Sequence, residues 1–172
     1  MTQYARPDSL VSNAGVWITE PLWDLIDETP PSDLDYIQTP NNTGTKLCEV
    51  GLTDVADPVS DANHIISWRG ARSGTGTKTI NTRIYLYEGA ALRATTQQEL
   101  EGAAFALHSY TLSAAEADSI TDYTDLRLRI EAILAGTGTR VGRVSWAEFA
   151  VPDEPDRVPR HGFTNYQTPG IV

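Results

Sequence analysis

Residues 109–130 read SYTLSAAEADSITDYTDLRLRI, and this stretch decides the fold class. Ser113 and Glu116 have the S-x-x-E spacing of a capping box, in which each side chain accepts a hydrogen bond from a free backbone N–H at a helix start. The alanines that follow favour a short helix of about two turns over 113–120. From Leu126 apolar and polar residues alternate, which predicts a strand with one buried face. Strand, short helix and strand in this order are typical of a corner of a β-sandwich.

Further strands are expected on both sides of this stretch. Alternation and apolar clusters predict strands over about 36–39, 45–53, 64–72, 79–88, 90–93, 104–112, 126–134 and 141–151. In the last of these, Trp146 and Phe149 are separated by an odd number of positions, so a regular strand would place them on opposite faces. Either both faces are covered or a β-bulge shifts the alternation. A second short helix should begin at Pro21, because proline suits the first helical position, and end near Glu28. We therefore predict an all-β fold: a two-sheet antiparallel sandwich, jelly-roll-like, with two short connecting helices.

The chain should contain one folded domain with an extended arm at each end. Its 172 residues are enough to bury a core. Residues 1–15 are polar and aperiodic, which predicts an extended N-terminal arm before a sandwich over 16–151. From Pro152 the chain is rich in proline, glycine and charged residues, which predicts an extended C-terminal arm over 152–172. We expect both arms to lie along neighbouring subunits, because neither has a core of its own; the alternative is that they pack against their own chain. No internal repeat is apparent.

Composition limits the classes of partner. The net charge of -10 and the pI near 4.6 argue against nucleic acid or an anionic membrane surface, although such acidity can also serve solubility alone. The N-terminus lacks the features of a signal peptide, and no apolar run approaches the length of a membrane span. Cys48 is the only cysteine, so the chain has no intrachain disulfide or thiolate metal site, and the residue is expected to be buried.

No set of residues points to catalysis, a cofactor or a metal. The only histidines are His64, His108 and His161, and no nucleophile-elbow pattern accompanies them. The glycine-rich run 70–79 is followed by a predicted strand rather than a helix, so a hairpin turn explains it better than a phosphate loop. Asp54, Asp57 and Asp61 share one loop and could bind calcium, but their spacing fits solvated turn residues better.

Arginines and tyrosines at outward positions of the predicted strands suggest a contact surface. If strands 79–88 and 126–134 share one sheet, these side chains form a face of the composition favoured at protein contacts, and the tyrosines could also stack on sugar rings. The alternative is an ordinary exposed face on which long side chains pair across strands. With the C-terminal arm included, the candidate contact residues are Arg69, Arg83, Tyr85, Tyr87, Arg127, Arg129, Arg157, Arg160, Phe163 and Tyr166.

A series of short motifs runs through the chain in a fixed order. They are Arg6-Pro7-Asp8, Trp17, Leu22, Ile26-Asp27-Glu28, Asp35-Tyr36-Ile37, Asp57-Pro58, His64, Tyr110-Thr111-Leu112, the run from Ile120 to Arg127, and Val144-Ser145-Trp146-Ala147. This series resembles small β-sandwich structural proteins of tailed bacteriophage virions, over about residues 6–152. The resemblance implies a non-enzymatic virion protein, and most specifically a capsid decoration (cement) protein whose arms contact neighbouring subunits.

The partners implied by this resemblance are the major capsid protein or other virion proteins, with further copies of the chain in a homo-oligomer. Two other functions stay open: a tail or fibre component, and a glycan-binding module that uses Tyr85 and Tyr87 for host attachment. The expected location is the virion, after synthesis in the host cytoplasm. No cofactor, nucleic acid or membrane partner is expected.

Overall fold

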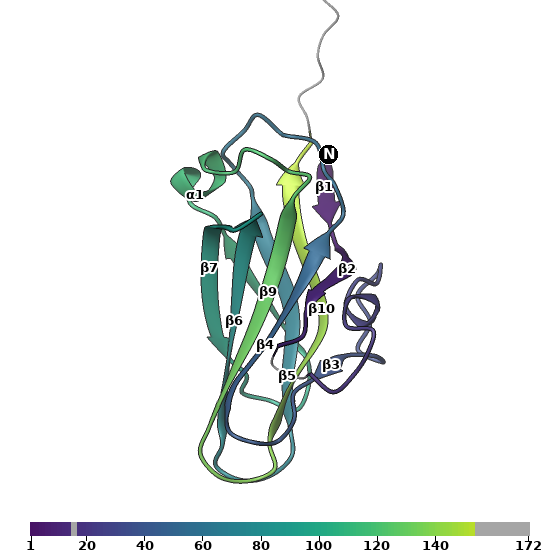
Figure 1. The fold of residues 1–172 in the computed structure, drawn as a ribbon, viewed down its shortest axis with the longest axis vertical. Coiled ribbons are helices and arrows are strands. Elements are labelled where there is room, and N and C mark those ends of the chain that lie inside the picture. Colours follow the sequence, from purple (N-terminus) through teal and green to yellow (C-terminus); the bar gives the residue numbers. More distant parts are fainter. Residues whose placement is uncertain (15–16, 154–172) are drawn as a thin grey trace, which may run out of the picture.

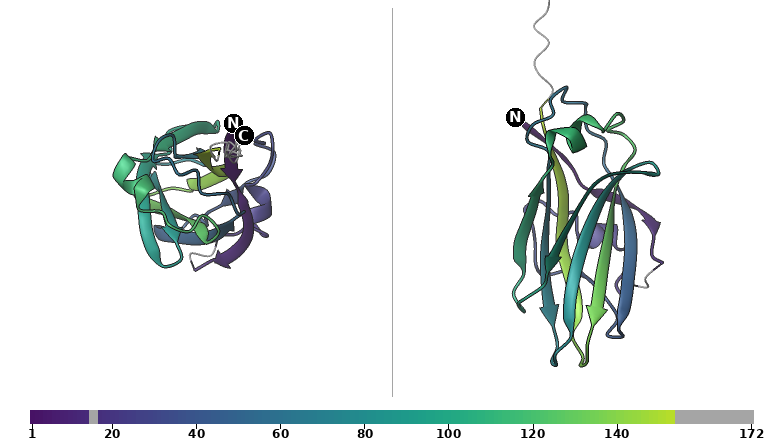
Figure 2. Two further views of the ribbon diagram at one scale, coloured as in Figure 1. Left: turned by 90° about the horizontal axis from the view of Figure 1, so that it is seen from above. Right: turned by 90° about the vertical axis from the view of Figure 1, so that its left-hand side faces the viewer.

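The computed structural model describes residues 1–14 and 17–153, which form two antiparallel sheets packed as a sandwich (Figures 1 and 2). Sheet A contains, in order, β1 (Thr2–Ala5), β10 (Val141–Pro152), β5 (Ile65–Ser73) and β8 (Ala106–Thr111), and β3 (Ile37–Gln38) also pairs with β10. Sheet B contains β2 (Pro7–Ser12), β4 (Gly44–Leu52), β9 (Leu126–Ala135), β6 (Thr79–Glu88) and β7 (Ala91–Glu99). The predicted all-β, two-sheet antiparallel sandwich is confirmed. Within the described ranges, no helix is long and apolar enough to cross a membrane.

The strand order is that of a jelly roll. Along the chain, β4 to β10 alternate between the sheets except at β6 and β7, which are neighbours in sheet B. The order β1-β10-β5-β8 faces the order β4-β9-β6-β7, and β2 adds one more strand at the edge of sheet B. Consecutive strands therefore mostly cross from one sheet to the other, and their connections form the two ends of the sandwich.

Alternation places the core where the sequence predicts it. From Ile80 to Leu86, every second residue of β6 is fully buried, as is the apolar set of β9 from Leu128 to Ala132. In β10, the pairing with β5 shifts between Val144 and Trp146, so the predicted β-bulge is present. Both Trp146 and Phe149 are nonetheless buried, because the segment that contains Glu28 covers part of the outer face of sheet A. The Trp146 indole N–H donates to the Glu28 carbonyl, at 3.1 Å.

The N-terminal residues belong to the sandwich, contrary to the prediction of an arm over 1–15. β1 pairs with β10, with Thr2 opposite Pro152, and β2 pairs with β4. These strands could not be recognised from apolar alternation, because they lie at sheet edges and are held by backbone hydrogen bonds. Most of β2 is exposed and shows no apolar period. The C-terminal arm predicted over 152–172 lies outside the described residues beyond Asp153.

The helical connections are shorter than predicted. Helix α1 (Ala114–Asp118) begins with the expected capping box: the Ser113 hydroxyl accepts from the Glu116 N–H at 3.3 Å, and the Glu116 carboxylate accepts from the Ser113 N–H at 2.8 Å. The helix predicted from Pro21 is only a 3-10 turn, η1 (Trp23–Leu25). Strand β7 extends well past the predicted 90–93, because an edge strand with many exposed positions shows little alternation.

Two turns with the same sequence pattern lie paired at the end of the sandwich opposite the N-terminus (Figure 1). One is GTGTK at 74–78 and the other is GTGTR at 136–140. The N–H of Thr139 donates to the carbonyl of Thr75 at 2.8 Å, the N–H of Thr77 donates to the carbonyl of Thr137 at 3.0 Å, and Gly76 bridges to Gly138. The run 70–79 is thus not a hairpin turn, because it leads from β5 in sheet A to β6 in sheet B. We refer to these segments as the paired GTGT turns.

Glycine is required in the paired turns for two physical reasons. The glycines of both turns have φ values between +93° and +117°, which side-chain-bearing residues rarely adopt. The backbones also approach closely: a Cβ added to Gly138 would lie 2.3 Å from the Thr75 carbonyl oxygen. The paired turns tie the β5–β6 connection to the β9–β10 connection.

Candidate functional site

The outer face of sheet B carries the arginine–tyrosine face, which consists of Arg83, Tyr85, Tyr87, Arg127 and Arg129. The first three lie on β6 and the last two on β9, and these strands are neighbours, as the sequence analysis required. In the register, Tyr85 lies opposite Arg129 and Tyr87 opposite Arg127. All five side chains are partly exposed. The structure therefore brings five of the ten predicted contact residues together on one surface.

The two tyrosines lie side by side on this face. Their ring centroids are 6.3 Å apart, with the ring planes at 39°. The Arg129 guanidinium lies 4.3 Å from the centroid of the Tyr87 ring and donates to the Tyr87 hydroxyl at 2.9 Å. The Tyr85 hydroxyl donates to Glu131, and burial together with this hydrogen bond raises the pKa of Tyr85. Each ring is thus held in place by a charged neighbour.

Two glutamates that the sequence analysis did not single out complete the face. Glu49, on β4, is 6 % exposed, and its carboxylate lies 2.7 Å from the Arg129 guanidinium and 3.8 Å from that of Arg127. Burial alone would lower the pKa of Arg129, but the Glu49 carboxylate raises it above the usual range. Glu131 lies 3.7 Å from Arg83. Glu49 was missed because it sits in an apolar strand and its partners depend on the β4–β9 register.

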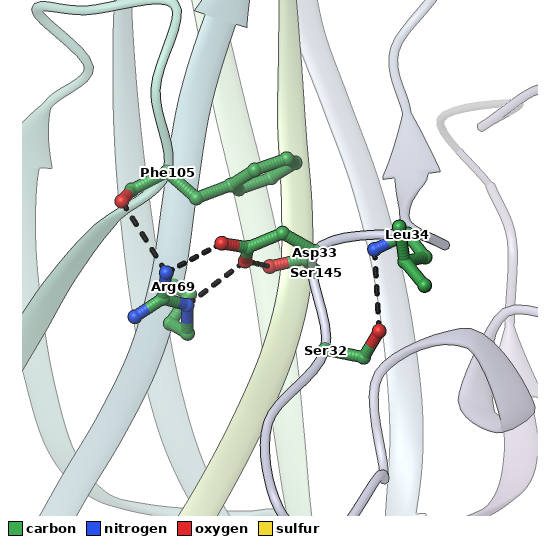
Figure 3. A network of polar contacts seen from close by, with 6 residues as sticks. All are labelled: Ser32, Asp33, Leu34, Arg69, Phe105 and Ser145. Atoms are coloured by element: carbon green, nitrogen blue, oxygen red, sulfur yellow. Dashed lines mark hydrogen bonds and ion pairs between the residues drawn. The ribbon is translucent and has the colours of Figure 1, made fainter.

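Arg69 is not part of this face, contrary to the prediction that grouped it there. It lies on β5 in sheet A, where its guanidinium binds both carboxylate oxygens of Asp33, at 2.9 and 2.5 Å (Figure 3). The Ser145 hydroxyl donates to the same carboxylate at 2.7 Å. The hydrogen bonds from Arg69 and Ser145 lower the pKa of Asp33, although burial opposes them. Arg69 therefore clamps residues 17–40, here called the 17–40 segment, onto sheet A.

The remaining predicted contact residues lie outside the described part of the chain. They are Arg157, Arg160, Phe163 and Tyr166.

The titratable residues considered for catalysis have structural roles where the structure describes them. Cys48 is fully buried, and burial raises the pKa of its thiol above the usual range, so it is not a thiolate at neutral pH. His64 is buried and hydrogen-bonded to Tyr123. Among residues 1–14 and 17–153, no three or more His, Cys, Asp or Glu side chains are placed to hold a metal ion. In the aspartate-rich loop, the Asp57 carboxylate accepts from the Val59 N–H at 2.8 Å, as in an ordinary turn.

No protein-family model matches the chain, and neither does any curated protein sequence. Solved structures of similar fold include the CBM36-1 domain of a multidomain xylanase from the hindgut metagenome of Trinervitermes trinervoides, with a TM-score of 0.41 and 9% identity over 90% of this chain and 99% of that chain. Another is a cyclase from Fischerella sp. TAU in complex with 4-(1H-indol-3-yl)butan-2-one, with a TM-score of 0.42 and 16% identity over 88% of this chain and 91% of that chain. A third is TmCBM61 in complex with beta-1,4-galactotriose, with a TM-score of 0.32 and 9% identity over 69% of this chain and 70% of that chain. At these identities and TM-scores, the matches do not bear on what this chain binds.

Proposed function

We propose that the chain is a non-enzymatic binding module that recognises a glycan through the arginine–tyrosine face, for host attachment by a bacteriophage virion. The observation that carries this proposal is the pair of partly exposed tyrosine rings, Tyr85 and Tyr87, set among arginine and glutamate side chains on one sheet face. Tyrosine combines an apolar ring face, suited to the C–H face of a sugar, with a polar edge. Guanidinium and carboxylate groups beside the rings supply donors and acceptors for sugar hydroxyls.

Contacts across neighbouring strands hold the two tyrosine rings of the face in place. Tyr85 is held by Glu131, and Tyr87 by Arg129, so their side chains are ordered before any ligand arrives. A preorganised site loses less side-chain entropy on binding than a flexible one. The charges of the arginines are largely balanced by Glu49 and Glu131, and the whole chain carries a net charge of -10. We therefore propose a neutral glycan as the ligand rather than a polyanion.

A glycan array tests this proposal with the full chain and two variants. The wild-type protein should bind at least one neutral glycan, and the Tyr85→Ala/Tyr87→Ala double variant should lose about tenfold or more in affinity, equivalent to about 1.4 kcal/mol. Tyr4→Ala is the matched control, because Tyr4 is also an exposed tyrosine beside an arginine, with Arg6 5.0 Å from its ring centroid, but lies on β1 of sheet A. An array without hits, or undiminished binding by the double variant, would remove the proposal.

A second candidate is a capsid decoration protein, and the observation that favours it is the resemblance to phage virion proteins over residues 6–152. Because the N-terminal residues are strands of the sandwich, the contact with neighbouring subunits would rest on the C-terminal residues. All the described strands end before residue 154. Deleting 154–172 should therefore abolish binding to particles while the sandwich still folds. Unchanged particle binding would refute this role for the arm.

A further inference from the structure

An apolar pocket with an acidic edge lies on the 17–40 segment, beside β3 and on the outer side of sheet A. Its volume is about 500 Å³, and it is lined by Ile18, Thr19, Glu20, Leu25, Leu34, Asp35 and Tyr36. Ile18 is 55% exposed and Leu34 is 96% exposed, so two large aliphatic side chains face solvent within a few residues of two carboxylates. Apolar side chains exposed in this way at a concave site mark a docking surface rather than ordinary surface residues.

The pocket is held in shape by contacts on both sides. The Asp33 carboxylate, next to Leu34, is bound by Arg69 and Ser145, and the Leu34 N–H donates to the Ser32 hydroxyl at 3.2 Å (Figure 3). On the other side, the Ile18 N–H donates to the Gln38 carbonyl at 3.0 Å. The exposure of Leu34 is therefore a feature of an anchored loop.

The acidic edge calls for a positively charged group. Two carboxylates, those of Glu20 and Asp35, are among the residues that line the pocket. Burial and the adjacent Asp35 carboxyl raise the pKa of Glu28 to about 7. A guanidinium is the group best suited to pair with carboxylates at such an edge. The pocket thus fits a peptide that presents an arginine next to apolar side chains.

The chain itself supplies such a peptide within reach. Residues 154–172 contain Arg157, Arg160 and Phe163. β3 pairs with Arg143 and Val144 of β10, eight residues before the end of that strand at Pro152. At about 3.3 Å per residue this is a distance of about 27 Å, so an extended segment that turns back after Pro152 reaches the level of β3 near residue 160. We propose that residues 157–163 dock in this pocket of the same chain, with Arg160 at Asp35 and Phe163 against Ile18 and Leu34.

Cysteine cross-linking in the full chain tests this docking. The Leu34→Cys/Phe163→Cys variant should form an intramolecular disulfide on mild oxidation, seen as a monomer of increased mobility in a non-reducing gel and confirmed by peptide mass spectrometry. Leu92→Cys/Phe163→Cys is the matched control, because Leu92 is 50% exposed on β7, at the edge of the other sheet. Docking should make the first pair react at least about tenfold faster through its higher effective concentration. Cys48 does not compete, because its thiol is buried.

Three results would overturn the proposal: equal rates for the two pairs, no cross-link from Leu34→Cys, or disulfide-linked dimers alone, which would assign the pocket to a second copy. A separate measurement tests whether the Asp35 carboxylate contributes to the docking. Adding Asp35→Asn to the Leu34→Cys/Phe163→Cys variant should slow the cross-link, whereas adding Glu101→Gln, at an exposed carboxylate on the β7–β8 connection, should not. An unchanged rate with Asp35→Asn would refute the placement of Arg160. The inference is independent of the glycan-binding proposal.

Discussion

The Nε2 atom of His64 lies 2.8 Å from the hydroxyl of Tyr123, and this contact joins the start of β5 to the connection between α1 and β9. His64 is fully buried, and its Nδ1 atom lies 3.1 Å from the Ala62 carbonyl, so Nδ1 carries the proton and Nε2 accepts from Tyr123. The imidazole also packs against Phe149, with ring centroids 5.9 Å apart. Two side chains that are 59 residues apart in sequence thereby close the end of the sandwich near the N-terminus.

Removing the Tyr123 hydroxyl should destabilise the protein. In Tyr123→Phe, Nε2 of His64 is left as a buried acceptor without its partner, which should lower the free energy of unfolding by about 1–2 kcal/mol. Urea denaturation at pH 8 measures this change. Tyr4→Phe, at an exposed tyrosine, is the control and should be close to wild type. Equal losses in the two variants would contradict the assigned role of the contact.

The stability contributed by neutral His64 should be lost in acid. Burial lowers the pKa of His64 below its ordinary value of 6.5, although the Ala62 carbonyl, Asp61 and Asp57 act in the opposite direction. The unfolded state therefore binds a proton at a higher pH than the folded state, so stability is retained above about pH 6.5 and decreases as the pH falls below it. His64→Gln removes this dependence. The stability difference between wild type and His64→Gln should shrink between about pH 7.5 and pH 5.5, and a constant difference would refute the interpretation.

The paired GTGT turns should tolerate no side chain at Gly138. Gly138→Ala combines an unfavourable φ of +117° with a Cβ placed 2.7 Å from the Gly76 Cα and still closer to the Thr75 carbonyl. Gly44→Ala is the matched control, because Gly44 has a φ of +104° but nothing within 4 Å of an added Cβ. The control should lose about 1–2 kcal/mol of unfolding free energy for backbone conformation alone, and Gly138→Ala about 3 kcal/mol or more. Similar losses would show that the close approach is unimportant.

Glu49 should stabilise sheet B through its arginine partners. Glu49→Gln keeps the shape of the side chain and removes the charge that binds Arg127 and Arg129. Because both arginines are about one-third exposed, with side-chain exposures of 32%, the expected loss is about 1–2 kcal/mol rather than the larger cost of a fully buried pair. Thermal denaturation measures it, with Glu101→Gln as a control at an exposed site. A melting temperature equal to that of the control would refute the contribution.

Features that depend on neighbouring residues could be predicted from the sequence. The capping box of Ser113 and Glu116 spans four residues, and the alternation in β6 and β9 follows from the strand period alone. The predicted arginine–tyrosine face required β6 and β9 to lie in one sheet, and they are neighbours in sheet B. These features are local, or follow from one correct pairing of strands.

Features that depend on long-range pairing could not be predicted in the same way. β1 and β2 have few buried residues and are identified only by their partners, β10 and β4. The paired GTGT turns are alike in sequence, but each alone predicts only a turn, and their contact depends on both sheets being in place. Arg69 was assigned to the wrong face because alternation predicts an outward side chain without predicting its sheet. Glu49 and Glu131 required the registers of β4 and β6 with β9.

The pairing of Thr2 with Pro152 determines how the sandwich would be displayed on a larger assembly. Both ends of the described chain leave from the same end of the sandwich, and the paired GTGT turns lie at the opposite end (Figure 1). A particle that holds the chain by its termini would therefore direct the glycine–threonine end outward. The strands of sheet B, with the arginine–tyrosine face, would then stand upright on the particle surface and be open to approach from the side.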